Sequence, residues 1–214
     1  MTARSVGARW PVHSANRIAV TVAALVVVSG CDNPPDAAPQ PSGTGPTASA
    51  PTADAFAALR RPWAHPPVAP GAACPVAAEV QQPDPRLGPL LGTGPARPAG
   101  IGTGAVLEYE SPALGGNWTD RTWGGQKVLW AVDPTVDGPV LVRGRQLDGS
   151  GGIAFEDPAQ IELRLSTGSY EGQTGGWRDY PSFTRLKTPG CYVYQIDTGA
   201  GTWSIVFTAR GPVV

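Results

Sequence analysis

The chain has 214 residues, enough for one folded domain with a segment left over, and its formal charge is only −1. Three of the 16 basic residues lie in the first 30 positions, which hold no acidic residue, so the rest of the chain carries 13 basic and 17 acidic residues. A mildly acidic chain without a basic run excludes nucleic acid as a partner and is not attracted to an anionic membrane surface.

Residues 1–30 have the organisation of an export signal. Arg4, Arg9 and Arg17 precede the apolar run of residues 18–28, and the small residues Ser29 and Gly30 follow it. The run is much shorter than the roughly 20 residues that a helix needs to cross a bilayer. The pattern therefore predicts a signal peptide over residues 1–30 and not a transmembrane helix.

Val28-Ser29-Gly30-Cys31 resembles the lipobox of bacterial lipoproteins. The resemblance implies that the Cys31 thiol receives a diacylglyceryl group, that the chain is cut before Cys31, and that the exported protein is held by lipid at the extracytoplasmic face of the cell membrane. Each buried CH₂ of such acyl chains contributes about 0.8 kcal/mol to membrane binding. The alternative is an ordinary secretory signal followed by a chance cysteine. In bacteria with two membranes, an Asp directly after the cysteine, here Asp32, can bias which membrane receives the lipoprotein. The sequence does not give the envelope type, so the membrane stays open.

Residues 31–55 are rich in Pro, Ala, Ser and Thr and contain too few large apolar side chains to build a core. They predict a disordered linker, extended at about 3.1 Å per residue where proline sets the conformation. Residues 56–70 are expected to form a short helix and a proline-rich approach to the domain. Thr52 or Asp54 could cap this helix, and Pro62 lies just beyond its end.

Residues 71–214 read as one all-β domain, because short apolar runs alternate with turns rich in Gly and Pro. Gly190 and Tyr192 add the spacing of a tyrosine corner, in which a tyrosine hydroxyl bonds to backbone a few residues upstream. The predicted fold is an immunoglobulin-like antiparallel β-sandwich. The expected strands cover residues 105–109, 127–132, 140–146, 153–156, 160–165, 182–186, 192–196 and 204–209. Alternation along them predicts core positions at Val128, Trp130, Val132, Val140, Val142, Ile161, Leu163, Leu165, Ile205 and Phe207.

The chain has three cysteines, and assigning Cys31 to lipid leaves Cys74 and Cys191. A pair in an oxidising compartment predicts a disulfide between them. A zinc site would need more ligands than this pair offers, and a reactive thiol would need a base. We therefore expect no metal and no cofactor.

Several blocks of residues 57–210 resemble a set of exported proteins and lipoproteins of high-GC, actinobacterial-type bacteria. The resemblance implies a common fold and brings no activity with it. The blocks are Leu59-Arg60-Arg61-Pro62, Pro70-Gly71 with Cys74-Pro75-Val76, Gly88-Pro89 with Gly92-Thr93-Gly94-Pro95, Trp123 to Trp130, Gly138 to Arg145 with Leu147-Asp148, and Thr188 to Tyr192.

Catalytic chemistry has few candidates in this chain. After the signal, His65 is the only histidine, and it lies in the proline-rich approach, so a Ser-His-Asp or Cys-His site is not expected. A glycosidase-like mechanism needs only two carboxyl groups about 5–10 Å apart. The candidates for that alternative are Glu108, Glu110, Asp120, Glu156, Asp157, Glu171 and Asp179.

A binding surface is the other hypothesis. Trp118, Trp123 and Trp177 lie in Gly-rich polar segments beside Arg121 and Arg178, and could stack on an envelope glycan or anchor a protein partner. The alternative is that the three rings cap the ends of the core. Arg143 and Arg145 could present two guanidinium groups on one strand face, although charges protecting a strand edge are the preferred interpretation.

These observations favour a lipid-anchored cell-envelope protein whose β-sandwich is a binding or structural module and not an enzyme. A carboxylate-dependent hydrolase of envelope carbohydrate is the alternative, and a wall spacer without any site is a third hypothesis.

Overall fold

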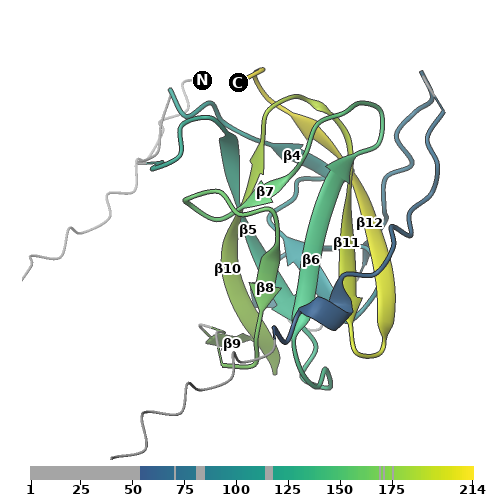
Figure 1. The fold of residues 1–214 in the computed structure, drawn as a ribbon, viewed down its shortest axis with the longest axis vertical. Helices are drawn as coiled ribbons and strands as arrows, with labels where there is room; N and C mark the ends of the chain where they lie inside the picture. The colour runs from purple at the N-terminus through teal and green to yellow at the C-terminus, as the bar shows by residue number, and fades with distance from the viewer. Residues whose placement is uncertain are drawn as a thin grey trace, which may run out of the picture. The chain divides into compact units, whose positions relative to one another are not determined.

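The structure is a computed structural model that describes residues 54–69, 71–80, 85–113, 118–168, 170, 172–174 and 176–214. In these residues the regular secondary structure is β-strand, apart from the two 3₁₀ turns η1 (Ala57–Leu59) and η2 (Pro85–Leu87). The strands form two sheets that face each other (Figure 1). The all-β sandwich predicted from the sequence is confirmed.

The first sheet, sheet A, has seven strands in the order β1-β2-β3-β5-β10-β7, and β9 also pairs with β10. All of its pairings are antiparallel. Its strands are β1 (Glu79–Val80), β2 (Leu90–Leu91), β3 (Ala96–Ala99), β5 (Gly124–Val132), β7 (Ala154–Phe155), β9 (Gly172–Thr174) and β10 (Trp177–Leu186).

The second sheet, sheet B, has five strands in the order β4-β12-β11-β6-β8. The first strand β4 runs parallel to the last strand β12, whereas the other pairings in this sheet are antiparallel, so the sandwich is mixed where the prediction was antiparallel. Its strands are β4 (Val106–Glu108), β6 (Val140–Gln146), β8 (Leu163–Leu165), β11 (Gly190–Thr198) and β12 (Gly201–Arg210).

The strand order is immunoglobulin-like. Taken in chain order, β3, β5, β6, β7, β10, β11 and β12 occupy the places of strands A to G, because β3-β5-β10-β7 gives the ABED sheet and β6-β11-β12 gives the CFG sheet. The short strands β1, β2, β4, β8 and β9 are additions to this arrangement. The chain crosses from sheet A to sheet B between β10 and β11, at the place of the E–F corner.

The tyrosine corner is present at that crossing. The Tyr192 hydroxyl donates to the Thr188 carbonyl at 2.7 Å, which ties the start of β11 to the turn before it. Two residues later, where an antibody domain has the second cysteine of its inter-sheet disulfide, Tyr194 meets Trp130 of β5 edge to face at 5.2 Å between ring centroids. An aromatic pair thus joins the two sheets through the middle of the core.

The predicted core positions are buried with one exception. Ile161 is 79 % exposed, because β8 begins three residues later than the predicted strand and leaves Ile161 in the bend before it. The remaining members are 5 % exposed or less: Val128, Trp130, Val132, Val140, Val142, Leu163, Leu165, Ile205 and Phe207.

Residues 61–69 and 71–77, which we call the strap, cross the outer face of sheet B (Figure 1). Hydrogen bonds fix both ends: Arg61 Nη1 donates to the Gly201 carbonyl at 2.6 Å, and Ala77 N donates to the Val206 carbonyl at 2.8 Å. Between them Ala64 N donates to the Gln195 side chain at 2.7 Å. Residues 191–198 of β11 are consequently buried on both faces. Before the strap, the expected short helix is the single 3₁₀ turn η1.

No helix in the described part of the chain is both long and apolar enough to span a bilayer.

Candidate functional site

The predicted tryptophan surface is not formed as one patch. Trp177 and Arg178 begin β10, whereas Trp118 and Trp123 pack around Arg185 at the far end of the same ten-residue strand. Trp177 is only 7 % exposed and Arg178 only 8 %. Arg121, on the surface, donates to the Pro112 carbonyl at 3.1 Å. The five residues therefore lie at two ends of the sandwich.

Trp177 and Arg178 are structural. The Arg97 guanidinium lies 4.3 Å from the centre of the Trp177 ring and covers it. Arg178 Nη2 donates to the carbonyl oxygens of Asp133 and Val136, at 3.2 and 2.8 Å, and so holds the loop between β5 and β6. Neither side chain is available to a ligand in this conformation.

Arg185 forms a buried centre that the sequence analysis missed. Its side chain has no exposed area, and the Trp118 ring lies 4.1 Å from its guanidinium carbon. A guanidinium has five N–H groups, and the geometry gives them five acceptors. These are the carbonyl oxygens of Gly124, Glu156, Asp120 and Trp123 and one carboxylate oxygen of Asp157, at 2.6–3.2 Å.

The carboxylates nearest this centre are held in their ionised form. The backbone N–H groups of Asp120 and Thr119, followed by the Arg185 side chain, lower the pKa of Asp157 to about 2. The Thr122 hydroxyl and backbone N–H lower the pKa of Asp120. A glycosidase acid needs a pKa raised towards neutrality, so this pair opposes the hydrolase hypothesis.

The remaining carboxyl candidates in the described part of the chain lie on different strands and loops. Glu108 is exposed at the end of β4, and Glu110 forms a bridge with Gly125 through its backbone. Asp179 lies near the start of β10, at the end of the strand opposite Arg185. Glu156 contributes its carbonyl oxygen to Arg185. Glu171 lies outside the described residues.

The low pKa of Asp157 predicts a pH dependence of stability. A carboxyl group whose pKa is lower in the folded state than the unfolded value of about 3.9 stabilises the fold above that value, and this contribution is lost as the pH falls towards about 2. We expect Asp157→Asn to be less stable than the wild type near neutral pH. The gap should narrow in acid, when urea midpoints are measured at several values between about pH 6 and pH 2. The exposed Asp137→Asn serves as the control, and a constant gap would contradict the assignment.

A small groove lies on the outer face of sheet B, beside the strap. Its volume is about 290 Å³, at the low end of the range of roughly 300–1,000 Å³ for ligand sites. We call it the Trp63 groove. It is lined by Trp63, Arg145, Gln146, Gly149, Ser150, Gly151 and Gly152.

Trp63 belongs to the strap and two arginines lie against its ring. The guanidinium carbons of Arg143 and Arg145 are 5.0 and 5.4 Å from the ring centre. Arg143 is neutralised by buried Asp197 at 2.8 Å and also donates to the Arg61 carbonyl. Among the described residues no carboxylate is within ion-pair distance of Arg145, which is exposed. The preferred interpretation as edge charges was wrong, because β6 lies between β11 and β8 in sheet B and Arg145 itself bridges to Gly152.

Two other cavities have fewer groups that could bind a charged or planar ligand. The larger, of about 620 Å³, is lined by exposed Ile161, and its cations Arg60 and Arg164 are both paired with Glu162. The other, of about 450 Å³, lies between the β5–β6 loop and the β11–β12 turn against Trp203, and Asp137 is its only charged lining residue in the described chain. The Trp63 groove alone, within the described residues, combines an exposed tryptophan with an exposed, unpaired cation.

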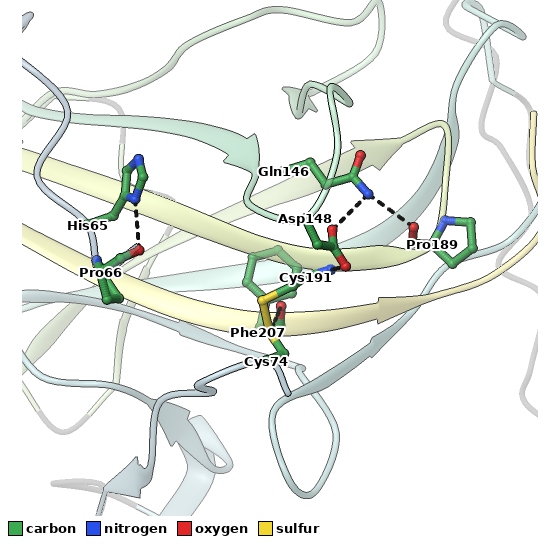
Figure 2. Close-up of a disulfide and its surroundings, with 8 residues drawn as sticks. All are labelled: His65, Pro66, Cys74, Gln146, Asp148, Pro189, Cys191 and Phe207. Atoms are coloured by element: carbon green, nitrogen blue, oxygen red, sulfur yellow. Dashed lines mark hydrogen bonds between the residues drawn. A yellow bond between two sulfur atoms is a disulfide. The ribbon is translucent and has the colours of Figure 1, made fainter. Parts of the chain in front are cut away.

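The predicted disulfide is confirmed. Cys74 and Cys191 are joined, with 5.5 Å between their Cα atoms, and the bond fixes the C-terminal part of the strap to the start of β11 (Figure 2). On the other side of Cys191, the Asp148 carboxylate accepts from the Cys191 N–H at 2.9 Å and from the Gln146 amide at 3.0 Å. The loop that bears the groove is thereby tied to the same strand. Cys31 lies outside the described residues.

The described residues contain no group of three or more His, Cys, Asp or Glu side chains that could hold a metal ion. The chain matches no protein-family model, no curated protein and no solved structure.

Proposed function

We propose that this chain is an exported, lipid-anchored protein of the cell envelope whose sandwich domain is a binding module on the extracytoplasmic side. The observation that carries the location is the series of arginines, short apolar run and Val28-Ser29-Gly30-Cys31 at the N-terminus. The Cys74–Cys191 disulfide supports export, because such bonds persist in oxidising compartments. The block resemblance to exported proteins of high-GC bacteria fits the same proposal.

The binding part of the proposal is supported by the Trp63 groove. An exposed tryptophan beside an unpaired guanidinium retains interaction capacity that a purely structural spacer would not need. The hydrolase alternative has no comparable support, since Asp120 and Asp157 bind backbone N–H groups and Asp157 also binds Arg185.

The anchor is tested by Cys31→Ala. We expect the wild-type protein to sediment with membranes and its N-terminal peptide to carry acyl chains on Cys31, because the thiol is the only acceptor for the diacylglyceryl group. The Cys31→Ala protein should lose the lipid and the membrane association, since no other membrane attachment is proposed. The measurements are membrane fractionation and the mass of the N-terminal peptide.

Ser29→Ala is the matched control, because it replaces one small residue of the box by another and should leave lipidation intact. Recovery of the wild-type protein with an unmodified Cys31 would refute the anchor.

A further inference from the structure

The Trp63 groove continues beyond its lining residues towards a second tryptophan. Arg145 of β6 forms a bridge with Gly152, which places the two residues side by side across the sheet at the usual spacing of about 5 Å. A Cβ atom on Gly152 would lie 3.9 Å from the Trp123 ring. Trp63, Arg145, Gly152 and Trp123 therefore follow one another across this surface. A ring contact joins the first two, a backbone bridge joins Arg145 to Gly152, and the Trp123 ring borders the space beside Gly152.

Gly149 and Gly151 let the loop between the two tryptophans pack directly on the Gln146 side chain. A Cβ on Gly151 would clash with the Gln146 side-chain oxygen, and one on Gly149 would come within 2.8 Å of the same side chain. The Gly151 N–H donates to that oxygen at 2.9 Å, so Gln146 fixes the loop from beneath. The floor consists of backbone, over which a flat, extended ligand can lie.

Within the described residues, two cations of this surface have no carboxylate partner, and the Asp148 carboxylate of the loop likewise has no cation. Arg145 lies against Trp63, and the exposed Lys187 ammonium is 4.5 Å from the centre of the Trp123 ring. The nearest acid of the loop, Asp148, turns its two oxygens to the Gln146 amide and the Cys191 N–H. Arg143 is paired with Asp197. Each tryptophan thus has an available cation beside it.

Trp63 keeps part of its ring accessible to a ligand. The residue is 38 % exposed, although the arginines of β6 lie against the ring and the His65 ring packs edge-on at 6.2 Å between centroids. The face of an indole is electron-rich and attracts the C–H groups that line one face of a pyranose ring. Cations close by increase the attraction for a sugar that carries a negative charge, and guanidinium groups bind carboxylates with two parallel hydrogen bonds.

We propose that the surface from Trp63 to Trp123 binds an acidic polysaccharide, with sugar rings stacked on the tryptophans and carboxylate groups paired with Arg145 and Lys187. The small volume of the Trp63 groove suits one sugar unit, and the bare floor at Gly152 lets the polymer continue to Trp123. The proposal rests on the proposed function only in that the sandwich is a binding module, and it does not require the lipid.

The test measures binding of the full-length protein, in neutral detergent, to polygalacturonate by isothermal titration calorimetry. We expect binding that weakens at high salt, and little binding to the fully methyl-esterified polymer, because esterification removes the charge and keeps the sugar ring. Trp63→Ala and Arg145→Ala should each weaken binding by about tenfold or more. Arg121→Ala and Tyr170→Ala are the controls for loss of a surface cation and an exposed ring, and should bind like the wild type.

Two further measurements distinguish stacking of sugar rings on tryptophan from charge attraction alone. Arg145→Glu should abolish binding while the melting temperature stays near that of the wild type, since the side chain is exposed. This variant keeps the test valid if Trp63→Ala disturbs the strap. Inorganic polyphosphate, which has charge but no sugar ring, should bind more weakly and be insensitive to Trp63→Ala.

The proposal is overturned if polygalacturonate does not bind, if Trp63→Ala and Arg145→Glu bind it like the wild type, or if polyphosphate binds as tightly as polygalacturonate. An unlipidated Cys31 in the same preparation would refute the anchor alone. Absence of binding in a correctly lipidated protein would refute the ligand alone.

Discussion

Replacement of Arg185 by methionine should lower the free energy of unfolding by about 3–5 kcal/mol. Methionine fills much of the same volume but removes the guanidinium donor from four backbone carbonyl oxygens, and Asp157 loses its cation while keeping the Asp120 N–H. Each buried group that loses its only partner costs about 1–3 kcal/mol, although relaxation and water will reduce the sum. Urea unfolding followed by tryptophan fluorescence measures the effect, because Trp118 stacks on this guanidinium.

Arg121→Met is the matched control for Arg185→Met. Arg121 lies on the surface beside the same loop and donates one hydrogen bond, to Pro112, so we expect a change within about 0.5 kcal/mol. Arg185→Lys should also destabilise the domain, because an ammonium has three donors where the guanidinium uses five. If Arg185→Met were as stable as Arg121→Met, the buried network would not be a structural centre.

The strands that could be predicted are those whose pattern is local. All eight expected strands occur, because a short apolar run bounded by turn residues is a property of the segment itself. The tyrosine corner was predictable for the same reason, since Gly190 and Tyr192 lie in one short turn. The two-residue strands β1 and β2 are too short to show alternation, and Pro98 within β3 argues against a strand from sequence alone.

The two clusters around arginine could not be read from the sequence. Arg185 lies on the outer face of sheet A, and its burial depends on the loop from Trp118 to Trp123 more than 60 residues earlier. Trp63 meets Arg145 only because the strap crosses sheet B, and nothing near either residue predicts that contact. The local signal was the spacing of Arg143 and Arg145, which places both on one face of a strand.

Removal of the disulfide by Cys74→Ala with Cys191→Ala should lower the free energy of unfolding by up to about 4–5 kcal/mol. The bond closes a loop of 117 residues, and cross-linking so long a loop restricts the unfolded chain strongly. The folded domain should survive at room temperature, because Arg61, Ala64 and Ala77 still tie the strap to sheet B. Hydrogen exchange should quicken first at the strap amides of Ala64 and Ala77, while the amides of β11 stay protected.

The number of reactive thiols in the unfolded wild-type protein tests the disulfide and the lipid anchor together. The chain has three cysteines, so a protein with both the disulfide and an acylated Cys31 should expose no reactive thiol when denatured without reductant. One reactive thiol would mean that the disulfide forms and Cys31 is free, and three would mean that neither prediction holds. The Cys74→Ala, Cys191→Ala double variant tests the acylation of Cys31 by itself, because any thiol that still reacts can belong only to Cys31.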